Sequence, residues 1–221
     1  ALIRETVEDF RPMPMPIERL SKGDPAYPVQ LTRYLAHEAP DSVAAMGNLS
    51  ILSRRKLAIF CSTQCPTTLT VQIQDLIQAL AQNGLAAIGG FHSPTERRCL
   101  AILLKDGSPI ILCPARSLDR LRIRRELRQP LQTDRLLFLS FFRSHRHRSD
   151  VEMAFRRNRF AAALADLILI LHAAPGSNTE RLCRELISWQ KPVYAMDKET
   201  NQNLIRLGAR PLALDNVNKL I

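Results

Sequence analysis

One stretch of the chain, residues 156–197, constrains the fold more than any other part of the sequence. Residues 166–174, DLILILHAA, form a short and almost continuously apolar run, which is typical of a parallel strand covered on both faces. A turn of small residues follows, then a helical pattern over residues 181–190 and a second apolar run over residues 193–196. Pro192 ends the helix because proline cannot continue it. The stretch therefore predicts a strand–helix–strand unit of a parallel sheet.

The turn between this strand and this helix is suited to binding an anion. Its small residues lie where a strand ends and a helix begins, so backbone N–H groups and the helix dipole point to one place. Asn178 or Thr179 is expected to cap the helix. The Arg-Asn-Arg sequence of the preceding helix can add charge-assisted hydrogen bonds to a phosphate. The predicted phosphate ligands of this region are Arg157, Asn158, Arg159, Gly176, Ser177 and Thr179.

Apolar runs alternate with helical patterns from residue 56 onward, which predicts an α/β fold with a Rossmann-like, doubly wound and mostly parallel sheet. The expected strands span residues 57–62, 85–91, 109–114, 136–142, 166–174, 193–196 and 211–214. The expected helices span residues 69–82, 94–105, 118–128, 151–163 and 181–190. We expect residues 1–52 to form an N-terminal extension with short helices, and residues 53–221 to form the Rossmann-like domain.

The composition favours a basic cytoplasmic protein with a polyanion as partner. The 221 residues carry a net charge of +10, and most basic residues are arginines, which can grip a phosphate with two parallel hydrogen bonds. No apolar run reaches the roughly 18 residues of a membrane helix, and the N-terminus lacks the apolar core of a signal peptide. The five cysteines, an odd number without metal-ligand spacing, suit a reducing compartment. We therefore expect no metal, no cofactor and no membrane contact.

Further phosphate ligands are expected after the first two strands and in two arginine-rich segments. Ser62 follows the first strand, and Gly89 and Gly90 allow close backbone approach after the second, at the edge where such sheets bind ligands. Arginines recur every four residues from position 116 to 128, so they are expected to line one face of the helix over residues 118–128. The arginines predicted to bind nucleic acid are Arg120 and Arg124 on that face, and Arg146 and Arg148 in a basic loop. The alternative is that both sets are simply exposed to solvent.

Several short motifs recur along the chain in a fixed order and spacing over about residues 24–214. They are Asp24-Pro25, Tyr27-Pro28, Gly47-Asn48-Leu49, Arg157-Asn158-Arg159, Gly176-Ser177-Asn178-Thr179, Pro192-Val193-Tyr194-Ala195, Asn203-Leu204-Ile205 and Gly208-Ala209. Together these motifs resemble the DprA/Smf family of bacterial DNA-processing proteins, whose central domain is Rossmann-like. The chain departs from the family pattern at three turns. The family's Gly-Ser-Arg is Cys61-Ser62-Thr63 here, its Gly-Ile-Asp after the second strand is missing, and its Ser-Glu after the fourth strand is Ser140-Phe141.

The resemblance implies a non-catalytic protein that binds single-stranded DNA through phosphate contacts, in DNA uptake and recombination. It also implies a homodimer and a recombinase as partner. Consistently, no carboxylate, histidine or serine stands at a spacing typical of acid–base or nucleophilic catalysis. The first alternative is a nucleotide-binding sensor or a divergent LOG-type phosphoribohydrolase, because Pro175–Glu180 resembles the Pro-Gly-Gly-x-Gly-Thr-x-x-Glu motif of those enzymes. The second is a protein-interaction partner whose ligand pocket is closed.

Overall fold

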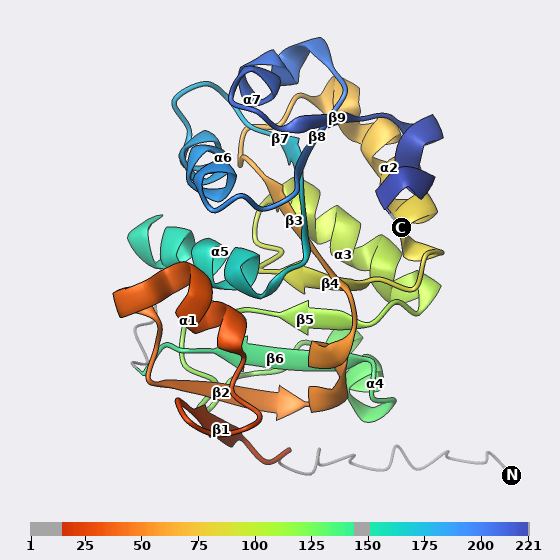
Figure 1. Ribbon diagram of the computed structural model, residues 1–221. Coiled ribbons are helices and arrows are strands. Elements are labelled where there is room, and N and C mark those ends of the chain that lie inside the picture. Colours follow the sequence, from red (N-terminus) through yellow and green to blue (C-terminus); the bar gives the residue numbers. More distant parts are fainter. Residues whose placement is uncertain (1–14, 144–150, 221) are drawn as a thin grey trace, which may run out of the picture.

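The computed structural model describes residues 15–143 and 151–220, and its nine strands form one sheet in the order β1-β2-β6-β5-β4-β3-β7-β8-β9 (Figure 1). The strands are β1 (Glu18–Ser21), β2 (Ser42–Gly47), β3 (Lys56–Cys61), β4 (Ala86–Gly89), β5 (Ile110–Leu112), β6 (Leu136–Ser140), β7 (Leu167–His172), β8 (Val193–Met196) and β9 (Arg210–Leu212). The α-helices are α1 (Val29–Leu35), α2 (Thr70–Ala81), α3 (Pro94–Asp106), α4 (Arg125–Gln132), α5 (Val151–Leu164), α6 (Asn178–Ser188) and α7 (Gln202–Arg206). Short 3-10 helices are η1 (Ala36–Glu38), η2 (Leu49–Ser53), η3 (Thr67–Leu69), η4 (Glu199–Asn201) and η5 (Leu214–Leu220).

The sheet is doubly wound around β3. From β3 the chain builds outward through β4 and β5 to β6, and it then returns to the other side of β3 with β7, β8 and β9. These seven strands are parallel, whereas β1 and β2 pair antiparallel at the β6 edge. The strand order reverses between β3 and β7, where the carboxyl ends of such strands leave a crevice for ligands. The predicted α/β fold with a doubly wound, mostly parallel sheet is confirmed.

Helices cover both faces of the sheet, which explains why its strands are apolar on both sides. One core cluster joins the sheet to α1, α5, α6 and α7 and contains Phe60 and Phe160. The other joins it to α2, α3 and α4 and contains Ile59 and Ile77. Because Ile59 and Phe60 are neighbours on β3, their side chains point to opposite faces. Figure 1 accordingly shows α1, α5 and α6 on one side of the sheet and α2 and α3 on the other.

The N-terminal extension adds two strands that sequence reasoning did not identify. Its expected short helix corresponds to α1, but the segments before and after α1 form the antiparallel strands β1 and β2. The centre of β2 is Ala44-Ala45, and alanine has low strand propensity, so pairing with β6 decides its conformation. Residues 1–14 of the extension lie outside the described residues, and the boundary between residues 52 and 53 stays a prediction.

The predicted helix over residues 118–128 is wrong. The helix of this region is α4, which begins at Arg125 and includes Pro130. Residues before it are irregular because Arg120 takes a left-handed φ of 56°, which a right-handed helix cannot accommodate. Ser117 Oγ also donates a 2.6 Å hydrogen bond to Asp119 Oδ2, which stabilises a local turn. The four-residue spacing of the arginines therefore does not place them on one helix face.

Gly47, at the end of β2, takes a conformation and a position that favour glycine. Its φ is +112°, and an added Cβ would overlap the Leu136 carbonyl oxygen and lie 2.8 Å from Leu131 Cδ1. We expect Gly47→Ala to lower the free energy of unfolding by about 2 kcal/mol more than Gly23→Ala does. Gly23 is a matched control, because its φ is +97° and no described atom lies within 4 Å of an added Cβ. Urea unfolding measures both variants, and equal losses would contradict a steric role for Leu136.

Candidate functional site

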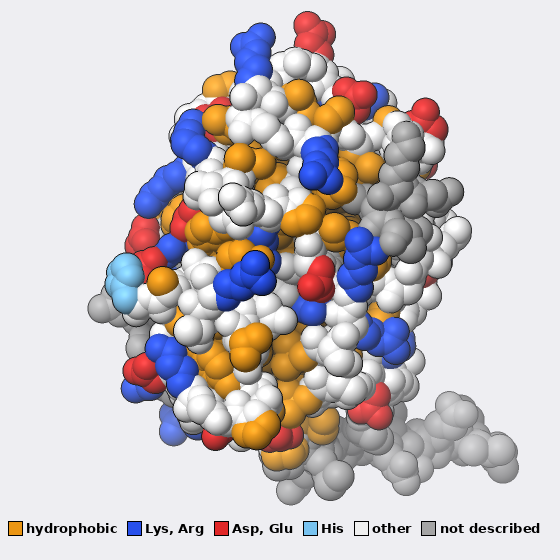
Figure 2. Space-filling model, in the orientation of Figure 1, with side chains coloured by type: hydrophobic (Ala, Val, Ile, Leu, Met, Phe, Trp, Pro, Cys, Tyr) orange, Lys and Arg blue, Asp and Glu red, His pale blue; other side chains and the backbone are white. Residues whose placement is uncertain are grey.

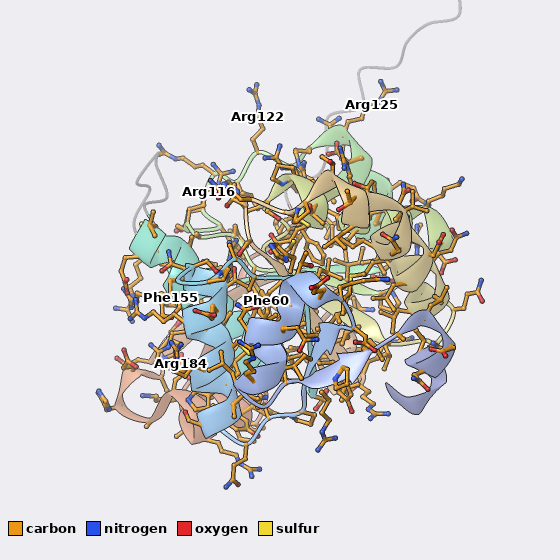
Figure 3. All side chains as sticks on the ribbon, turned by 90° about the horizontal axis from the view of Figure 1, so that it is seen from above. Phe60, Arg116, Arg122, Arg125, Phe155 and Arg184 are labelled. Carbon is orange, nitrogen blue, oxygen red and sulfur yellow. The ribbon has the colours of Figure 1, made fainter. Side chains whose placement is uncertain are left out.

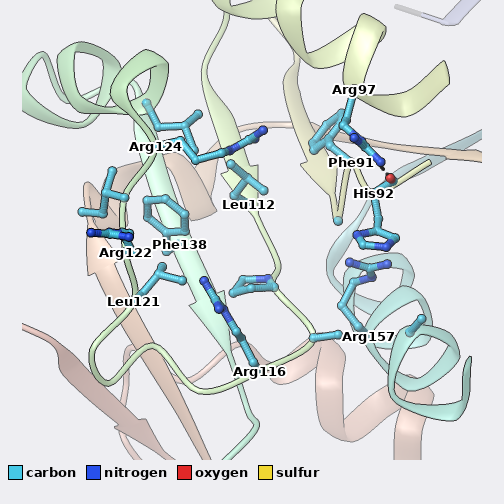
Figure 4. A pocket seen from close by; sticks show the side chains of 16 residues that line it. Phe91, His92, Arg97, Leu112, Arg116, Leu121, Arg122, Arg124, Phe138 and Arg157 are labelled. Carbon is cyan, nitrogen blue, oxygen red and sulfur yellow. Dashed lines mark hydrogen bonds between the residues drawn. The ribbon is translucent and has the colours of Figure 1, made fainter. Parts of the chain in front are cut away.

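A cavity of about 430 Å³ opens at the carboxyl ends of β4, β5 and β6 (Figure 4). Its apolar wall includes Phe91, Leu112 and Phe138. Among the described residues that line it, none is Asp or Glu. The arginines that line it are Arg97, Arg116, Arg122, Arg124 and Arg157. A concave surface that carries one sign of charge concentrates ions of the opposite sign, so this cavity favours an anionic ligand.

Arg157 of α5 is the buried cation of this cavity, only 5% exposed. Its Nε donates a hydrogen bond to Asn158 Oδ1 (2.6 Å) and its Nη1 to the Cys113 carbonyl oxygen (3.3 Å). Its guanidinium lies against Gly90, where an added Cβ would overlap it. Burial lowers the pKa of Arg157, and the charge of Glu96 opposes this effect. No carboxylate in residues 15–143 or 151–220 forms an ion pair with Arg157. A buried cation without a fixed counter-ion favours a bound anion.

The other four arginines of the cavity are exposed, so they can adjust to a ligand. Arg122 projects from the loop before α4, and Arg116 lies on the loop that follows β5 (Figure 3). Arg97, in the first turns of α3, donates from Nε to the His92 carbonyl oxygen at 3.0 Å. The five guanidinium groups thus come from three separate parts of the chain and are joined only by the fold.

The loop beneath Arg157 is held by a buried carboxylate, that of Glu96 on α3. Glu96 Oε1 accepts the N–H of Cys61 (3.0 Å), and Oε2 accepts those of His92 (2.8 Å) and Ser93 (3.1 Å). Ser93 Oγ accepts the Glu96 N–H at 3.2 Å, which completes a capping box at the start of α3. Since three N–H groups satisfy this carboxylate, its role is to fix the ends of β3 and β4 below the cavity.

A second cavity of about 270 Å³ adjoins the first, because Arg157 and His92 line both. Asn158 and Thr179 line this smaller cavity as well. The structure therefore brings together Arg157 and Asn158 on α5 with Thr179 at the start of α6. These three residues come from the two segments that the sequence singled out as phosphate-binding.

The turn before α6 uses its hydrogen-bond donors internally. Ser177 is the N-cap and accepts the Glu180 N–H at 3.2 Å, so the predicted cap one or two residues later is wrong. Gly176 donates its N–H to Glu180 Oε2 at 2.8 Å. Asn203 Nδ2 donates to Glu180 Oε1 at 2.6 Å, and this bond, with that of Gly176, lowers the pKa of Glu180. The carboxylate of Glu180 therefore satisfies a donor that we expected a phosphate to meet.

Of the remaining residues predicted to bind phosphate, some line the larger cavity and others line neither cavity. Arg159 lines neither cavity, because its guanidinium forms ion pairs with Glu38 (2.6 Å) and Glu185 (2.8 Å) and lies over the Trp189 ring. Ser62 Oγ donates to Ser177 Oγ at 3.2 Å across the crevice between β3 and β7. Gly90 and Arg124 line the larger cavity, whereas Ser62, Gly89, Gly176, Ser177 and Arg120 line neither. The predicted ligands Arg146 and Arg148 lie outside the described residues.

Sequence reasoning did not single out Arg97, although a signal for it was present. The sequence Ser93-Pro-Thr-Glu96 is a capping box, which places a helix start directly after the Gly89-Gly90 turn. A side chain in the first turns of that helix must lie near the turn. The sequence therefore contained enough information to predict Arg97 as a residue of the same cavity.

The fold and these cavities define a Rossmann-like α/β protein with a basic cavity at the carboxyl edge of its sheet. The family described as DNA recombination-mediator protein A matches residues 18–219, and the chain therefore belongs to that family. The resemblance seen in the sequence motifs is confirmed.

Solved structures support the same fold. DNA processing protein A (DprA) from Streptococcus pneumoniae is 20% identical with a TM-score of 0.76, over 94% of this chain and 74% of that one. DNA processing protein A from Helicobacter pylori, whose structure is described for its unique single-stranded DNA binding mode, is 20% identical with a TM-score of 0.74, over 93% of this chain and 96% of that one. The molybdenum cofactor carrier protein from Chlamydomonas reinhardtii is 11% identical with a TM-score of 0.52, over 76% of this chain and 96% of that one. At these identities the likeness shows the fold alone.

No curated protein sequence matches the chain. In the part of the chain that the structure describes, no helix has the length and apolar character needed to cross a bilayer. The same described residues contain no group of three or more His, Cys, Asp or Glu side chains that could hold a metal ion.

Proposed function

We propose that this member of the recombination-mediator family binds single-stranded DNA through its phosphates and catalyses no reaction. The observation that carries the proposal is Arg157, a buried cation without a carboxylate partner in the described residues, which lies in a cavity lined by four further arginines. A phosphate supplies the missing negative charge and accepts two parallel hydrogen bonds from a guanidinium. The DNA-binding mode described for the H. pylori relative supports the same ligand class.

The shape of the cavity favours a single strand over a duplex. At about 430 Å³ it is large enough for one nucleotide unit, and Leu121, Ile123 and Phe138 give it an apolar wall that an unpaired base can contact. A base inside a duplex is stacked and paired, so it cannot reach that wall. Basic side chains on the face seen in Figure 2 are scattered and form no continuous stripe there. We therefore assign the main DNA contacts to the cavity, because five arginines gather there.

The proposed absence of catalysis rests on the side chains at the cavity. Its described lining offers arginines, apolar groups and His92, but no carboxylate that could orient or accept a proton from that histidine. Glu180, the residue that a phosphoribohydrolase of the LOG type would use, is engaged by Gly176 and Asn203. A recombinase partner, a homodimer and a role in DNA uptake remain predictions from the resemblance, and a cytoplasmic location remains a prediction from the composition.

The salt dependence of binding tests this function. Fluorescence anisotropy with a labelled single strand should give a logarithmic salt slope of about −3.5 if all five arginines of the cavity contact phosphates, since each contact contributes about −0.7 on single strands. The combined change Arg116→Ala and Arg122→Ala should make the slope shallower by about 1.4. Arg54→Ala is the control, because this exposed arginine precedes β3 at the opposite edge of the sheet.

Competition separates the proposed function from its alternative. Unlabelled single strands should displace the probe, whereas mononucleotides at the same phosphate concentration should not. Displacement by a mononucleotide with weak salt dependence would instead support the nucleotide-binding alternative. No binding at low salt would overturn the proposal.

A further inference from the structure

The side chains of the larger cavity offer many hydrogen-bond donors and very few acceptors. Its described lining contains five arginines and His92, and it contains no Asp, Glu, Asn, Gln, Ser or Thr. A guanidinium can only donate hydrogen bonds, whereas a neutral histidine ring supplies one acceptor nitrogen. Figure 4 shows the His92 ring next to Arg157, across the cavity from Phe138. The wall that contains Phe138 therefore has no side-chain acceptor beside it in the described lining.

Backbone carbonyl groups on that side of the cavity are already hydrogen-bonded within the protein. The Arg116 carbonyl oxygen accepts a hydrogen bond from Ser140 Oγ at 2.6 Å. The Arg124 carbonyl oxygen accepts the Leu127 N–H at 3.0 Å, at the start of α4. A ligand group that enters this side of the cavity and needs an acceptor meets arginine N–H groups instead, and an unpaired polar group costs binding free energy.

Arg124 differs from the other arginines of the cavity because it has a carboxylate partner. Its Nη1 lies 3.2 Å from Glu126 Oε1, and both side chains are about half exposed. Among the described residues, none of the other four arginines of the cavity forms an ion pair. The Arg124–Glu126 pair carries no net charge, so it attracts a phosphate less than an unpaired arginine does. Arg124 therefore suits a neutral group that accepts hydrogen bonds.

The apolar wall of the cavity places such a group beside Arg124. Arg124, Leu112 and Phe138 line the same cavity, and Figure 4 shows the Arg124 side chain extending towards Leu112. Leu112 and Phe138 are buried, so they form a fixed surface. An unpaired base whose face lies on this surface presents its edge to the Arg124 guanidinium.

We propose that the larger cavity selects guanine among the bases of a bound single strand, and that Arg124 is the residue that recognises it. This inference rests on the proposed function. Guanine carries two neighbouring acceptors, O6 and N7, and one arginine can donate to both of them. Adenine and cytosine carry an amino donor at this edge, and thymine carries one acceptor beside a methyl group. The amino group of guanine lies on a different edge, which can stay in water.

Fluorescence anisotropy with strands of equal length tests this preference. Every third base of a thymine strand is replaced by guanine, adenine, cytosine, hypoxanthine or 7-deazaguanine. The guanine strand should bind about 10-fold more tightly than the adenine and cytosine strands. Hypoxanthine keeps O6 and N7 and should match guanine, whereas 7-deazaguanine lacks N7 and should lose most of the gain. Equal affinities for all five strands would overturn this inference alone, and no binding of any strand at low salt would overturn the proposed function with it.

The variant Arg124→Ala identifies the residue that recognises the base. It should lower the affinity for the guanine strand to that for the adenine strand and leave the salt slope unchanged, because no phosphate contact is lost. Arg122→Ala is the matched control in the same loop. It should keep the guanine preference and make the salt slope shallower by about 0.7. A guanine preference that survives Arg124→Ala, or a slope that this variant makes shallower by about 0.7, would contradict the role of Arg124.

Discussion

Arg157→Ala is expected to weaken binding of single-stranded DNA by about 100-fold, which corresponds to about 2.7 kcal/mol. Among the arginines that line the cavity, Arg157 is buried. Its contact with a phosphate is therefore shielded from water and should contribute more binding free energy than a contact at the rim. The variant should not lose stability to a similar degree, because a buried cation without a carboxylate partner contributes little to folding. Anisotropy at fixed salt measures the affinity, and thermal unfolding measures the stability.

Arg159→Ala is the matched control for that result. Arg159 lies two residues further along α5, but Glu38 and Glu185 hold its guanidinium. Its loss should lower stability and leave DNA affinity within about threefold of the wild type, since rim or remote charges act mainly through long-range attraction. Equal affinity losses for both variants, with both proteins folded, would show that Arg157 holds no special place in the site.

The positions of most strands along the chain could be predicted from the sequence, because parallel strands covered on both faces form short, almost continuously apolar runs. The run DLILILHAA became β7, with every residue from Leu167 to His172 buried. That apolar pattern is a property of the strand's own residues, so it can be recognised without knowing which strands pair with it. The strand β2 was not identified, because its alanines acquire strand geometry from pairing with β6.

The arginines of the cavity were harder to predict than the strands. The sequence shows that an arginine belongs to a helix, but it does not show whether its side chain points into the cavity or away from it. Within Arg157-Asn158-Arg159, the two arginines are about 200° apart around a helix, so only one of them can face a given cavity. Which one does so is decided by how α5 packs on the sheet. The arginines before α4 show the opposite case, since the predicted helix is absent and Arg116, Arg122 and Arg124 still line one cavity. The basic composition predicted a polyanion as ligand, but which arginines line the cavity is decided by the tertiary fold.

The cap of α6 was available in the sequence and was assigned to the wrong residue. Ser177-Asn-Thr-Glu180 has the Ser-x-x-Glu spacing of a capping box, which predicts the cap at Ser177. The same motif indicates that the glutamate folds back on the turn, as the Gly176 bond shows. This rule would have predicted that Glu180, rather than a phosphate, accepts the N–H of Gly176.

Gly90→Ala is expected to reduce DNA affinity about as much as Arg157→Ala does, by about 100-fold. An added Cβ would occupy the volume that the Arg157 Nη1 and Cζ atoms now fill. The φ of Gly90 is not left-handed, so alanine suits the backbone, and the displaced atoms are the flexible end of a long side chain. The expected result is therefore a folded protein whose Arg157 guanidinium has left the cavity. Gly84→Ala is the control for affinity: no described atom lies within 4 Å of its added Cβ, and its φ of +68° strains alanine, so it should lose stability without losing DNA affinity.

The double variant decides whether the two changes act through one contact. If Gly90→Ala acts only by displacing Arg157, the double variant should bind as weakly as either single variant, and the coupling energy should nearly equal the effect of one change. Additive losses would mean that Gly90 contributes separately, through close approach of the DNA to its backbone. An unchanged affinity in Gly90→Ala would mean that Arg157 works as well from a displaced position, and the buried guanidinium would then lose its role as the centre of the site.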